Sequence, residues 1–263
     1  MNKDYLYDNY RLVEFYDDMY MYDDDFELWK EYIKPGMHIL EIACGTGRLT
    51  KLIAENIKNI KIDALDYSEE MIDLLEKKEE KFKFQIGTSI NLIRADMRYY
   101  SSERLYDLII ISSNSLNHIE LNSDMSDLFK SIYNMLKSGG KLLFDILNPK
   151  FSFLIHDINE WHDGRIYYQE KSGKYFYSDE KNRYNYKEQI NYVTYRYYYC
   201  DKKGNKKIES PTSYMDIKIR LYFPQEMDYY ISNTKFKVID KYDWYDKCKF
   251  NGNTSEQIYI LQK

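Results

Sequence analysis

The sequence predicts an α/β fold in which helices cover both faces of a mostly parallel β-sheet. Two observations carry this prediction. Between residues 37 and 147, short apolar runs alternate with amphipathic segments of helical period, which is typical of parallel strands buried on both faces. The first run, ILEIA at residues 39–43, is followed at once by Gly45-Thr46-Gly47 and a helical pattern, which outlines a nucleotide-binding turn.

The elements of this core follow from hydrophobic period and turn residues. Strands are expected at residues 37–43, 60–65, 90–95, 107–112 and 141–147. Helices are expected at residues 48–57, 68–80 and 125–136. Right-handed crossovers between parallel strands would wind these elements into a Rossmann-like core.

The flanking segments have a different texture. Residues 4–33 carry apolar residues at helical spacing, interrupted near the acidic run at 23–25, and a turn at Pro35-Gly36 ends them. Between residues 165 and 223, alternating segments joined by turn clusters predict an antiparallel sheet. A helix at 224–234 and strands at 236–245 and 256–262 would complete a seven-stranded core sheet.

Four parts are therefore expected in the chain. These are an N-terminal helical lid (1–36), a nucleotide-binding core (37–149), an antiparallel β insertion that shapes the acceptor pocket (150–223), and a C-terminal completion of the core (224–263).

Composition and charge narrow the functional class. The net charge is −5 and the 38 basic residues form no block, which disfavours a nucleic-acid partner. Three widely spaced cysteines fit neither a disulfide scaffold nor a tetrahedral zinc site, so no metal is expected. The polar, acidic start and the lack of a long apolar stretch predict a cytoplasmic protein without a membrane partner.

The glycine turn differs from a dinucleotide site. A dinucleotide fingerprint has a third glycine for close helix packing, but the residue three positions after the second glycine is Thr50. What remains is E-x-x-x-G-x-G, with Glu41 four residues before Gly45. Asp66 lies at the end of the second strand, where a carboxylate can accept both hydroxyls of a ribose. The expected ligand is a ribonucleoside without a pyrophosphate.

A further acidic position follows the third strand. Asp96 and Met97 lie where the adenine of such a ligand is expected, and an Asp side chain can accept a hydrogen bond from an exocyclic amine.

This arrangement resembles the class I S-adenosylmethionine-dependent methyltransferases over most of residues 37–147. The resemblance runs through LEIACGTGRLT, DYSEEMIDLL, RADM, YDLIIISSNSLNH and LKSGGKLLFDILNP, in that order. It implies an enzyme with the seven-stranded methyltransferase sheet, S-adenosylmethionine as cofactor and S-adenosylhomocysteine as product. The core residues that it implies for cofactor binding are Glu41, Ala43, Gly45, Thr46, Gly47, Asp66, Tyr67, Met71, Asp96, Met97 and Ser112.

The flanks are similar to those of small-molecule N-methyltransferases, in particular aminosugar N-methyltransferases and, more distantly, glycine N-methyltransferases. That likeness implies that Tyr10 and Tyr16 close over the sulfonium and the substrate, and that His118 is a candidate base. Tyr16 also lies on an apolar helical face, so core packing is an equal alternative for it. His118 lies in a segment after the fourth strand, at the edge where open α/β sheets bind ligands.

The predicted reaction is an in-line displacement in which a small-molecule amine takes the methyl group. An O-methyltransferase for a hydroxylated small molecule stays open, because the cofactor half would look the same. A non-catalytic S-adenosylmethionine-binding module is the alternative from another class. A homodimer is possible, and the sequence does not name the acceptor.

Overall fold

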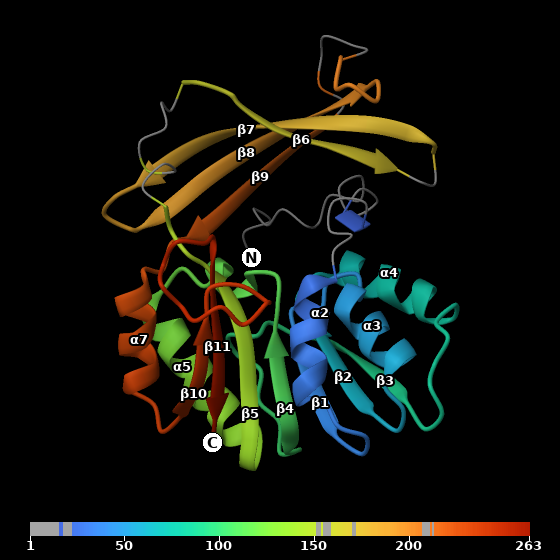
Figure 1. Ribbon diagram of the computed structural model, residues 1–263, viewed down its shortest axis with the longest axis vertical. Coiled ribbons are helices and arrows are strands. Elements are labelled where there is room, and N and C mark those ends of the chain that lie inside the picture. The colour runs from blue at the N-terminus through green and yellow to red at the C-terminus, as the bar shows by residue number, and fades with distance from the viewer. Residues whose placement is uncertain are drawn as a thin grey trace. The chain divides into compact units, whose positions relative to one another are not determined.

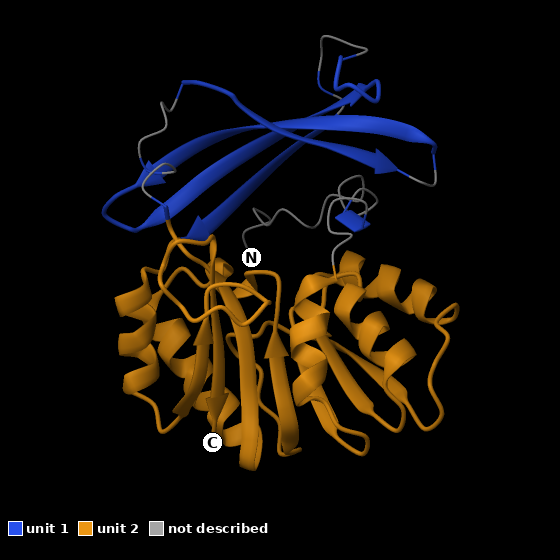
Figure 2. Ribbon diagram, in the orientation of Figure 1, with its two compact units in different colours: residues 1–21, 150–220 blue, residues 22–149, 221–263 orange. Residues whose placement is uncertain are grey.

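The chain divides into two compact units (Figure 2). In this computed structural model, the described residues are 16–17, 23–150, 154, 159–169, 172–206, 211 and 213–263. The larger unit comprises residues 22–149 and 221–263, and the smaller unit comprises residues 1–21 and 150–220. The helical turn at residues 24–32, which the sequence assigned to the lid, therefore belongs to the larger unit.

A seven-stranded sheet forms the larger unit (Figure 1). Its strands lie in the order β10-β11-β5-β4-β1-β2-β3, and all neighbours pair in parallel except β11, which is antiparallel to β5 and β10. The strands are β1 (His38–Ile42), β2 (Lys61–Asp66), β3 (Ser89–Arg94), β4 (Tyr106–Ile111), β5 (Leu136–Leu147), β10 (Lys237–Tyr242) and β11 (Glu256–Gln262). The predicted Rossmann-like, mostly parallel sheet is confirmed.

Helices cover both faces of this sheet. They are α2 (Asp24–Trp29), the 3₁₀ helix η2 (Lys30–Tyr32), α3 (Arg48–Asn56), α4 (Glu69–Glu79), the 3₁₀ helix η3 (Ser115–His118), α5 (Asn122–Met135) and α7 (Pro224–Ser232). Apolar residues of α2, α3 and α4 share one core with the sheet, and those of α5 and α7 share the other.

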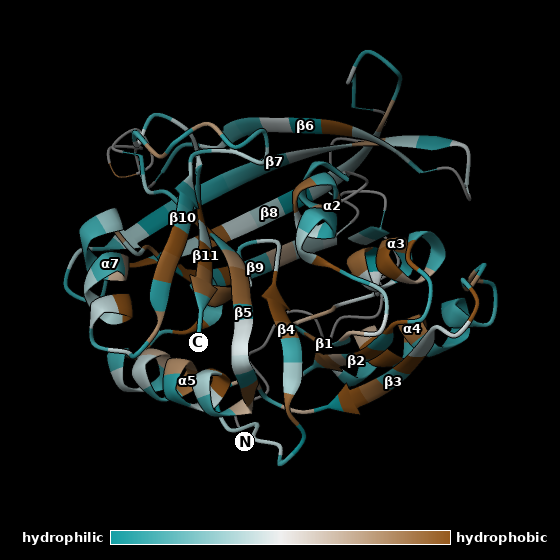
Figure 3. Ribbon diagram, turned by 60° about the horizontal axis from the view of Figure 1, so that its bottom comes forward, coloured by the Kyte–Doolittle hydropathy of each residue, from teal (hydrophilic) through white to brown (hydrophobic). Residues whose placement is uncertain are grey.

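The central strands supply both cores by alternation. In β4, Leu108 and Ile110 belong to the core under α3, and Ile109 and Ile111 belong to the core under α5. Successive side chains of a strand point to opposite faces, so a strand buried on both sides must be apolar throughout. Figure 3 shows the apolar residues of β4 as a brown run toward its arrowhead, and such a run can be recognised in the sequence.

One strand begins earlier than expected. The sequence places a turn at Ser138-Gly139-Gly140 and a strand from residue 141, whereas β5 begins at Leu136. The amide of Gly139 donates to the carbonyl of Lys263, and the amide of Lys263 donates to the carbonyl of Gly140. These bonds supply the glycine backbone with the partners that a strand requires.

The smaller unit contains the expected antiparallel sheet. Its four strands, in sheet order, are β6 (His162–Gln169), β7 (Lys174–Asn185), β8 (Ile190–Cys200) and β9 (Ser213–Arg220). Phe176, Tyr197 and Met215 form an apolar cluster within it. Arg196 is paired with Asp179, and its guanidinium lies 3.3 Å from the ring centroid of Trp161.

Among the described residues of the whole chain, no helix has the length and apolar content needed to cross a bilayer.

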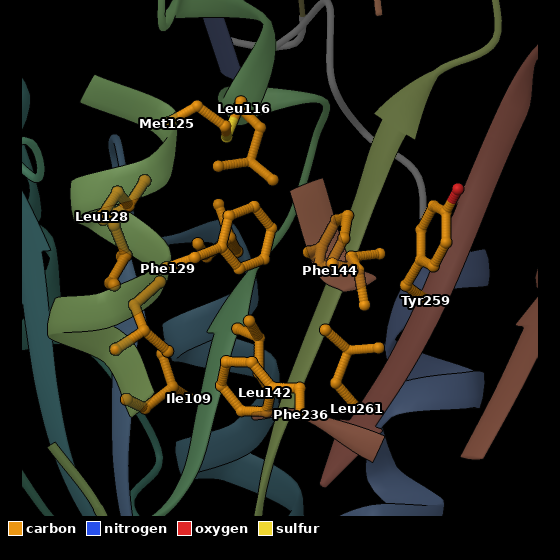
Figure 4. Packing of buried hydrophobic residues seen from close by; sticks show 14 of the residues in the cluster. Ile109, Leu116, Met125, Leu128, Phe129, Leu142, Phe144, Phe236, Tyr259 and Leu261 are labelled. Atoms are coloured by element: carbon orange, nitrogen blue, oxygen red, sulfur yellow. The ribbon is translucent and has the colours of Figure 1, made fainter. Parts of the chain in front are cut away.

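The core under α5 and α7 provides a test of the packing. Phe144 is fully buried, stacks on Tyr259 at 4.9 Å between ring centroids and meets the edge of Phe129 at 5.8 Å (Figure 4). Phe144→Ala should lower the free energy of unfolding by about 3 to 5 kcal/mol, measured by urea denaturation, because it removes these contacts and leaves a cavity. Phe84→Ala, at a ring that is 42% exposed, is the control. A loss as small for Phe144 as for Phe84 would contradict the packing described.

Candidate functional site

The turn after β1 has an unusual backbone. Ala43, Gly45 and Gly47 have φ values of 59°, 54° and 84°, which lie in the left-handed region. The amide of Gly47 donates to the carbonyl of Cys44 at 2.9 Å, which closes the turn directly before α3. Glycine adopts this conformation without the steric cost that other residues bear. The turn lies at the carboxyl end of β1, the edge where open α/β sheets bind ligands.

Gly47 is also required by the packing of two helices. It is the N-cap of α3, and a Cβ atom added to it would lie 2.2 Å from Cδ1 of Leu75 in α4. Thr46 beside it is buried, and its carbonyl accepts a hydrogen bond from Nζ of Lys78 in the same helix. From the sequence, the second glycine was expected to contact the ligand, and its contact with α4 was not predicted.

Asp66 joins the turn after β1 to the turn after β2. One carboxylate oxygen accepts the amide of Gly45 at 2.7 Å, and the other accepts the amide of Ser68 at 2.9 Å. Burial raises the pKa of Asp66, although these backbone hydrogen bonds oppose the shift. Tyr67, the next residue, is 46% exposed, and Met71 is buried in the first turn of α4. The predicted cofactor-binding residues Asp66, Tyr67 and Met71 thus lie together at the carboxyl end of β2.

Asp96 is engaged by its own neighbour. Nε of Arg98 lies 3.0 Å from both carboxylate oxygens, and the backbone amide of Arg98 donates to one of them at 2.9 Å. Burial opposes the charged form, but these hydrogen bonds outweigh it and lower the pKa of Asp96. Met97 packs against the core under α5. The contact between Asp96 and an adenine amine stays a prediction, with Arg98 as an additional partner that the sequence analysis did not name.

The segment after β4 carries the candidate base. Ser112 is buried, Ser113 and Asn114 have φ values of 61° and 60°, and η3 then leads to His118. His118 is half-buried at the end of η3. This segment follows β4, which pairs with β1, so it begins at the same edge of the sheet as the glycine turn.

Glu41 is placed inside the fold. Its side chain is buried within β1, and one of its oxygens accepts a hydrogen bond from the Thr50 hydroxyl at 2.6 Å. Burial raises the pKa of Glu41 to about 8. The contact explains Thr50: the residue that replaces the third glycine joins α3 to β1. A direct contact of Glu41 with a cofactor stays a prediction.

One buried and one partly buried charged residue near the turn were not predicted from the sequence. Arg48, the first residue of α3, makes a bidentate ion pair with Asp25 of α2, and Nη1 lies 2.7 Å from Oδ1. Nη2 of Arg48 also lies 3.3 Å from Oγ of Ser113. The side chain of Asp25 is fully buried. The sequence gave no clear signal for Asp25, because it lies in an acidic run that is typical of a solvated surface.

Asp145 is the third residue that was missed. It is fully buried in β5 and accepts hydrogen bonds from the backbone amides of Ser113 and Asn114 and from the hydroxyl of Tyr245. Burial raises the pKa of Asp145 to about 7. A signal existed in this case: a lone Asp inside the apolar strand KLLFDIL is the kind of buried polar residue that requires partners.

The two aromatic residues predicted to close over the sulfonium belong to the N-terminal segment of the smaller unit. Tyr16 is helical and half-buried, and it belongs to the smaller unit. Tyr10 lies outside the described residues. The closure of these rings over a sulfonium therefore stays a prediction.

Comparison with known proteins identifies the larger unit. Residues 39–140 match the family described as "Methyltransferase domain". Residues 39–140 of the chain form a methyltransferase domain. The glycine turn, Asp66, Asp96 and Asn114 all lie inside the matched residues, and the resemblance drawn from the sequence is confirmed.

Two curated methyltransferases are also similar to this chain in sequence. The chain is 31% identical to malonyl-[acyl-carrier protein] O-methyltransferase 1 of Ilyobacter polytropus over 165 residues, which are 63% of this chain and 56% of that protein. It is 27% identical to (S)-tetrahydroprotoberberine N-methyltransferase of Eschscholzia californica over 138 residues, which are 51% of this chain and 37% of that protein. The chain thus spans about half the length of the curated relatives that it matches.

A solved structure extends the likeness to the whole chain. An amino pentose methyltransferase from Micromonospora echinaspora, solved with S-adenosylmethionine bound, has a TM-score of 0.68 and 12% identity, and the match covers 100% of this chain and 99% of that one. At this identity the match shows a shared fold.

Glu41 leads to a prediction on stability. Its pKa in the folded protein, about 8, lies above the ordinary value of 4.5, so between these values the folded chain binds more protons than the unfolded chain. The free energy of unfolding should therefore fall as pH rises from 4.5 to 8. Glu41→Gln should remove much of this slope, because glutamine has no proton to lose. The change in the free energy of unfolding that the substitution causes should therefore be more favourable at pH 8 than at pH 4.5, by roughly 2 to 4 kcal/mol in urea denaturation.

Thr50→Val is the control for this prediction, because it removes the hydrogen bond but keeps the buried carboxyl group. The slope should persist in that variant, with the same sign. An equal slope in wild type and Glu41→Gln would show that Glu41 does not hold its proton in this range.

Proposed function

We propose that the chain is an S-adenosylmethionine-dependent N-methyltransferase for a small molecule. The observation that carries the proposal is Asp66, which joins the glycine turn to the end of β2 inside the methyltransferase domain. We also propose the cytoplasm as its location, because Cys44, Cys200 and Cys248 are free thiols.

The donor set suits a ribonucleoside. A carboxylate offers about four lone-pair positions, and the amides of Gly45 and Ser68 take two of them at Asp66. The backbone of Tyr67 is a further partner of Asp66, and the ribose hydroxyls are proposed to bind at the same carboxylate. Gly45 places backbone without a side chain beside this carboxylate, and the methionine part of the cofactor is proposed to lie along the turn from Gly45 to Gly47. Tyr67, Met71, Asp96, Met97 and Ser112 belong to the same proposed site.

The chemistry divides between the cofactor and the chain. S-adenosylmethionine supplies an activated methyl group bound to a sulfonium, so the main task of the protein is alignment, with reacting atoms ~3 to 3.5 Å apart. An alkylamine is mostly protonated at neutral pH and must lose a proton before it attacks. His118 is proposed to accept that proton, as a neutral imidazole can. Tyr10 and Tyr16 are proposed to face the sulfonium, because aromatic faces attract cations.

The choice of an amine over a hydroxyl or carboxyl acceptor rests on two relatives. The Eschscholzia protein is named an N-methyltransferase, and the amino pentose methyltransferase shares the fold over the whole chain, including the antiparallel sheet. The second candidate is an O-methyltransferase, which is supported by the higher identity to the Ilyobacter enzyme.

A direct assay distinguishes these candidates. Purified protein is incubated with S-adenosylmethionine and, separately, with aminosugars, alkylamines, hydroxylated sugars and malonyl carboxylates, and S-adenosylhomocysteine is measured by mass spectrometry. Turnover with amines is expected. Turnover with hydroxyl or carboxyl acceptors alone would replace the proposal with the O-methyltransferase. Binding of S-adenosylmethionine by calorimetry without product from any acceptor would indicate a binding module.

Two substitutions should have opposite effects. Asp66→Ala should weaken S-adenosylmethionine binding by about 10-fold or more, because a hydrogen-bonded buried group is lost. His118→Ala should leave that affinity within about 3-fold and lower kcat by roughly 100-fold, which is typical for the loss of a general base. Calorimetry and steady-state kinetics measure the two quantities.

The control is Asp73→Ala, which removes a carboxylate of α4 that is half-exposed and paired with Arg94. It should change neither quantity. If Asp66→Ala lowered only kcat and His118→Ala lowered only the affinity, both role assignments would be wrong.

A further inference from the structure

The segment after β4 is attached to β5 by one side chain. Oδ2 of Asp145 lies 3.2 Å from the amide nitrogen of Ser113, and Oδ1 accepts the amide of Asn114. The hydroxyl of Tyr245 donates to Oδ2 at 3.0 Å. Asp145 is fully buried, so its carboxylate has exchanged water for these three donors.

The backbone held by Asp145 is strained. Ser113 and Asn114 have φ values of 61° and 60°, and both residues have a Cβ atom. In the left-handed region a serine costs about 1 kcal/mol or more and an asparagine less, so two such residues in succession indicate support from the surroundings. The two amides that donate to one carboxylate are contacts that support this conformation.

This conformation determines where η3 begins. The hydroxyl of Ser115 donates to the carbonyl of Ser112 at 2.7 Å, and η3 continues from Ser115 to His118. Oδ1 of Asn117 accepts the amide of Leu147, the last residue of β5. Strand β5 therefore fixes the segment at two places, before η3 through Asp145 and within η3 through Asn117.

The carboxylate is itself held from the opposite side. Tyr245, which donates to Asp145, meets the edge of Trp29 of α2 at 5.9 Å between ring centroids. Arg48, which is paired with Asp25 of the same helix, contacts the Ser113 hydroxyl. Helix α2 and the first residue of α3 thus reach the same few residues that Asp145 holds.

We propose that Asp145 is a positioning residue for methyl transfer: its buried carboxylate fixes the backbone of Ser113 and Asn114 and so sets the place of His118. The proposal rests on the proposed function, because it assigns Asp145 to the step in which His118 accepts a proton. Asp145 acts through the backbone and does not touch the substrate.

A carboxylate is required because donors approach both oxygens. An asparagine at this position presents one carbonyl oxygen and one NH₂ group, and the NH₂ group cannot accept from an amide or a hydroxyl. Asp145→Asn therefore leaves at least one buried donor without an acceptor, and the segment that precedes η3 loses part of its support.

The test separates positioning from stability. Asp145→Asn should keep the S-adenosylmethionine dissociation constant within about 3-fold while it lowers kcat at saturating acceptor by about 10-fold to 100-fold, as expected for a misplaced group near the chemistry. An unchanged kcat in a folded Asp145→Asn variant would overturn the proposal. An equal loss of cofactor affinity and kcat would also overturn it, because the effect would then not be confined to the segment with His118.

The matched control is Asp63→Asn. Asp63 is a buried carboxylate of β2 that accepts from Tyr106, Arg104 and Asn91, far in sequence from the segment after β4. The Asp63→Asn substitution should lower the midpoint of urea denaturation without a change in kcat. A loss of kcat as large as that of Asp145→Asn would attribute the effect to stability and overturn the proposal.

Hydrogen exchange in the wild-type protein needs neither activity nor a folded variant. The amides of Ser113 and Asn114 should be protected from exchange, because both donate to a buried carboxylate. Rapid exchange at both amides would overturn the proposal. If no acceptor is methylated, the proposed function fails, and protected amides in wild type with rapid exchange in Asp145→Asn would still support the positioning of the segment.

Discussion

The turns at the carboxyl edge of the sheet depend on carboxylates that accept backbone amides. Parallel strands end together at one edge, and the chain must leave each strand through a turn whose amides have no partner in the sheet. Asp66 satisfies the amides of Gly45 and Ser68, and Asp145 satisfies those of Ser113 and Asn114. Two side chains therefore fix the three turns that carry most of the proposed site.

This solution places carboxyl groups in the interior of the protein. Asp25, Glu41 and Asp145 are buried at this edge, and Arg48 is the cation that pairs with one of them. Burial raises the pKa of Glu41 to about 8, although Thr50 and Arg48 oppose the shift, and it raises the pKa of Asp145 to about 7, so both values lie close to neutrality. At Asp63, nearer the amino end of β2, the balance differs, because hydrogen bonds from Tyr106, Asn91 and Arg104 and the charge of His38 outweigh burial and lower its pKa. The proposed site thus lies at the edge where burial raises the pKa values of Glu41, Asp66 and Asp145.

Much of this structure could be predicted from the sequence, because strands buried on both faces appear as continuous apolar runs and several turns between them contain glycine. Asp66 could be placed as well, since its position at the end of a strand is a local feature. The contacts of Asp25 with Arg48 and of Asp145 with Ser113 join residues 23 and 32 positions apart, and no local pattern marks such pairs. The early start of β5 has the same cause, because its glycines pair with Lys263.

The strained pair Ser113-Asn114 has a consequence for variation among relatives of this chain. Glycine at either position would adopt the left-handed conformation without a Cβ penalty, and the local sequence would then specify the segment by itself. With serine and asparagine at these positions, the left-handed conformation depends both on the segment itself and on Asp145 of the next strand. Residue 145 should therefore vary together with residues 113 and 114, and a relative with glycine there would be free to lose the buried carboxylate.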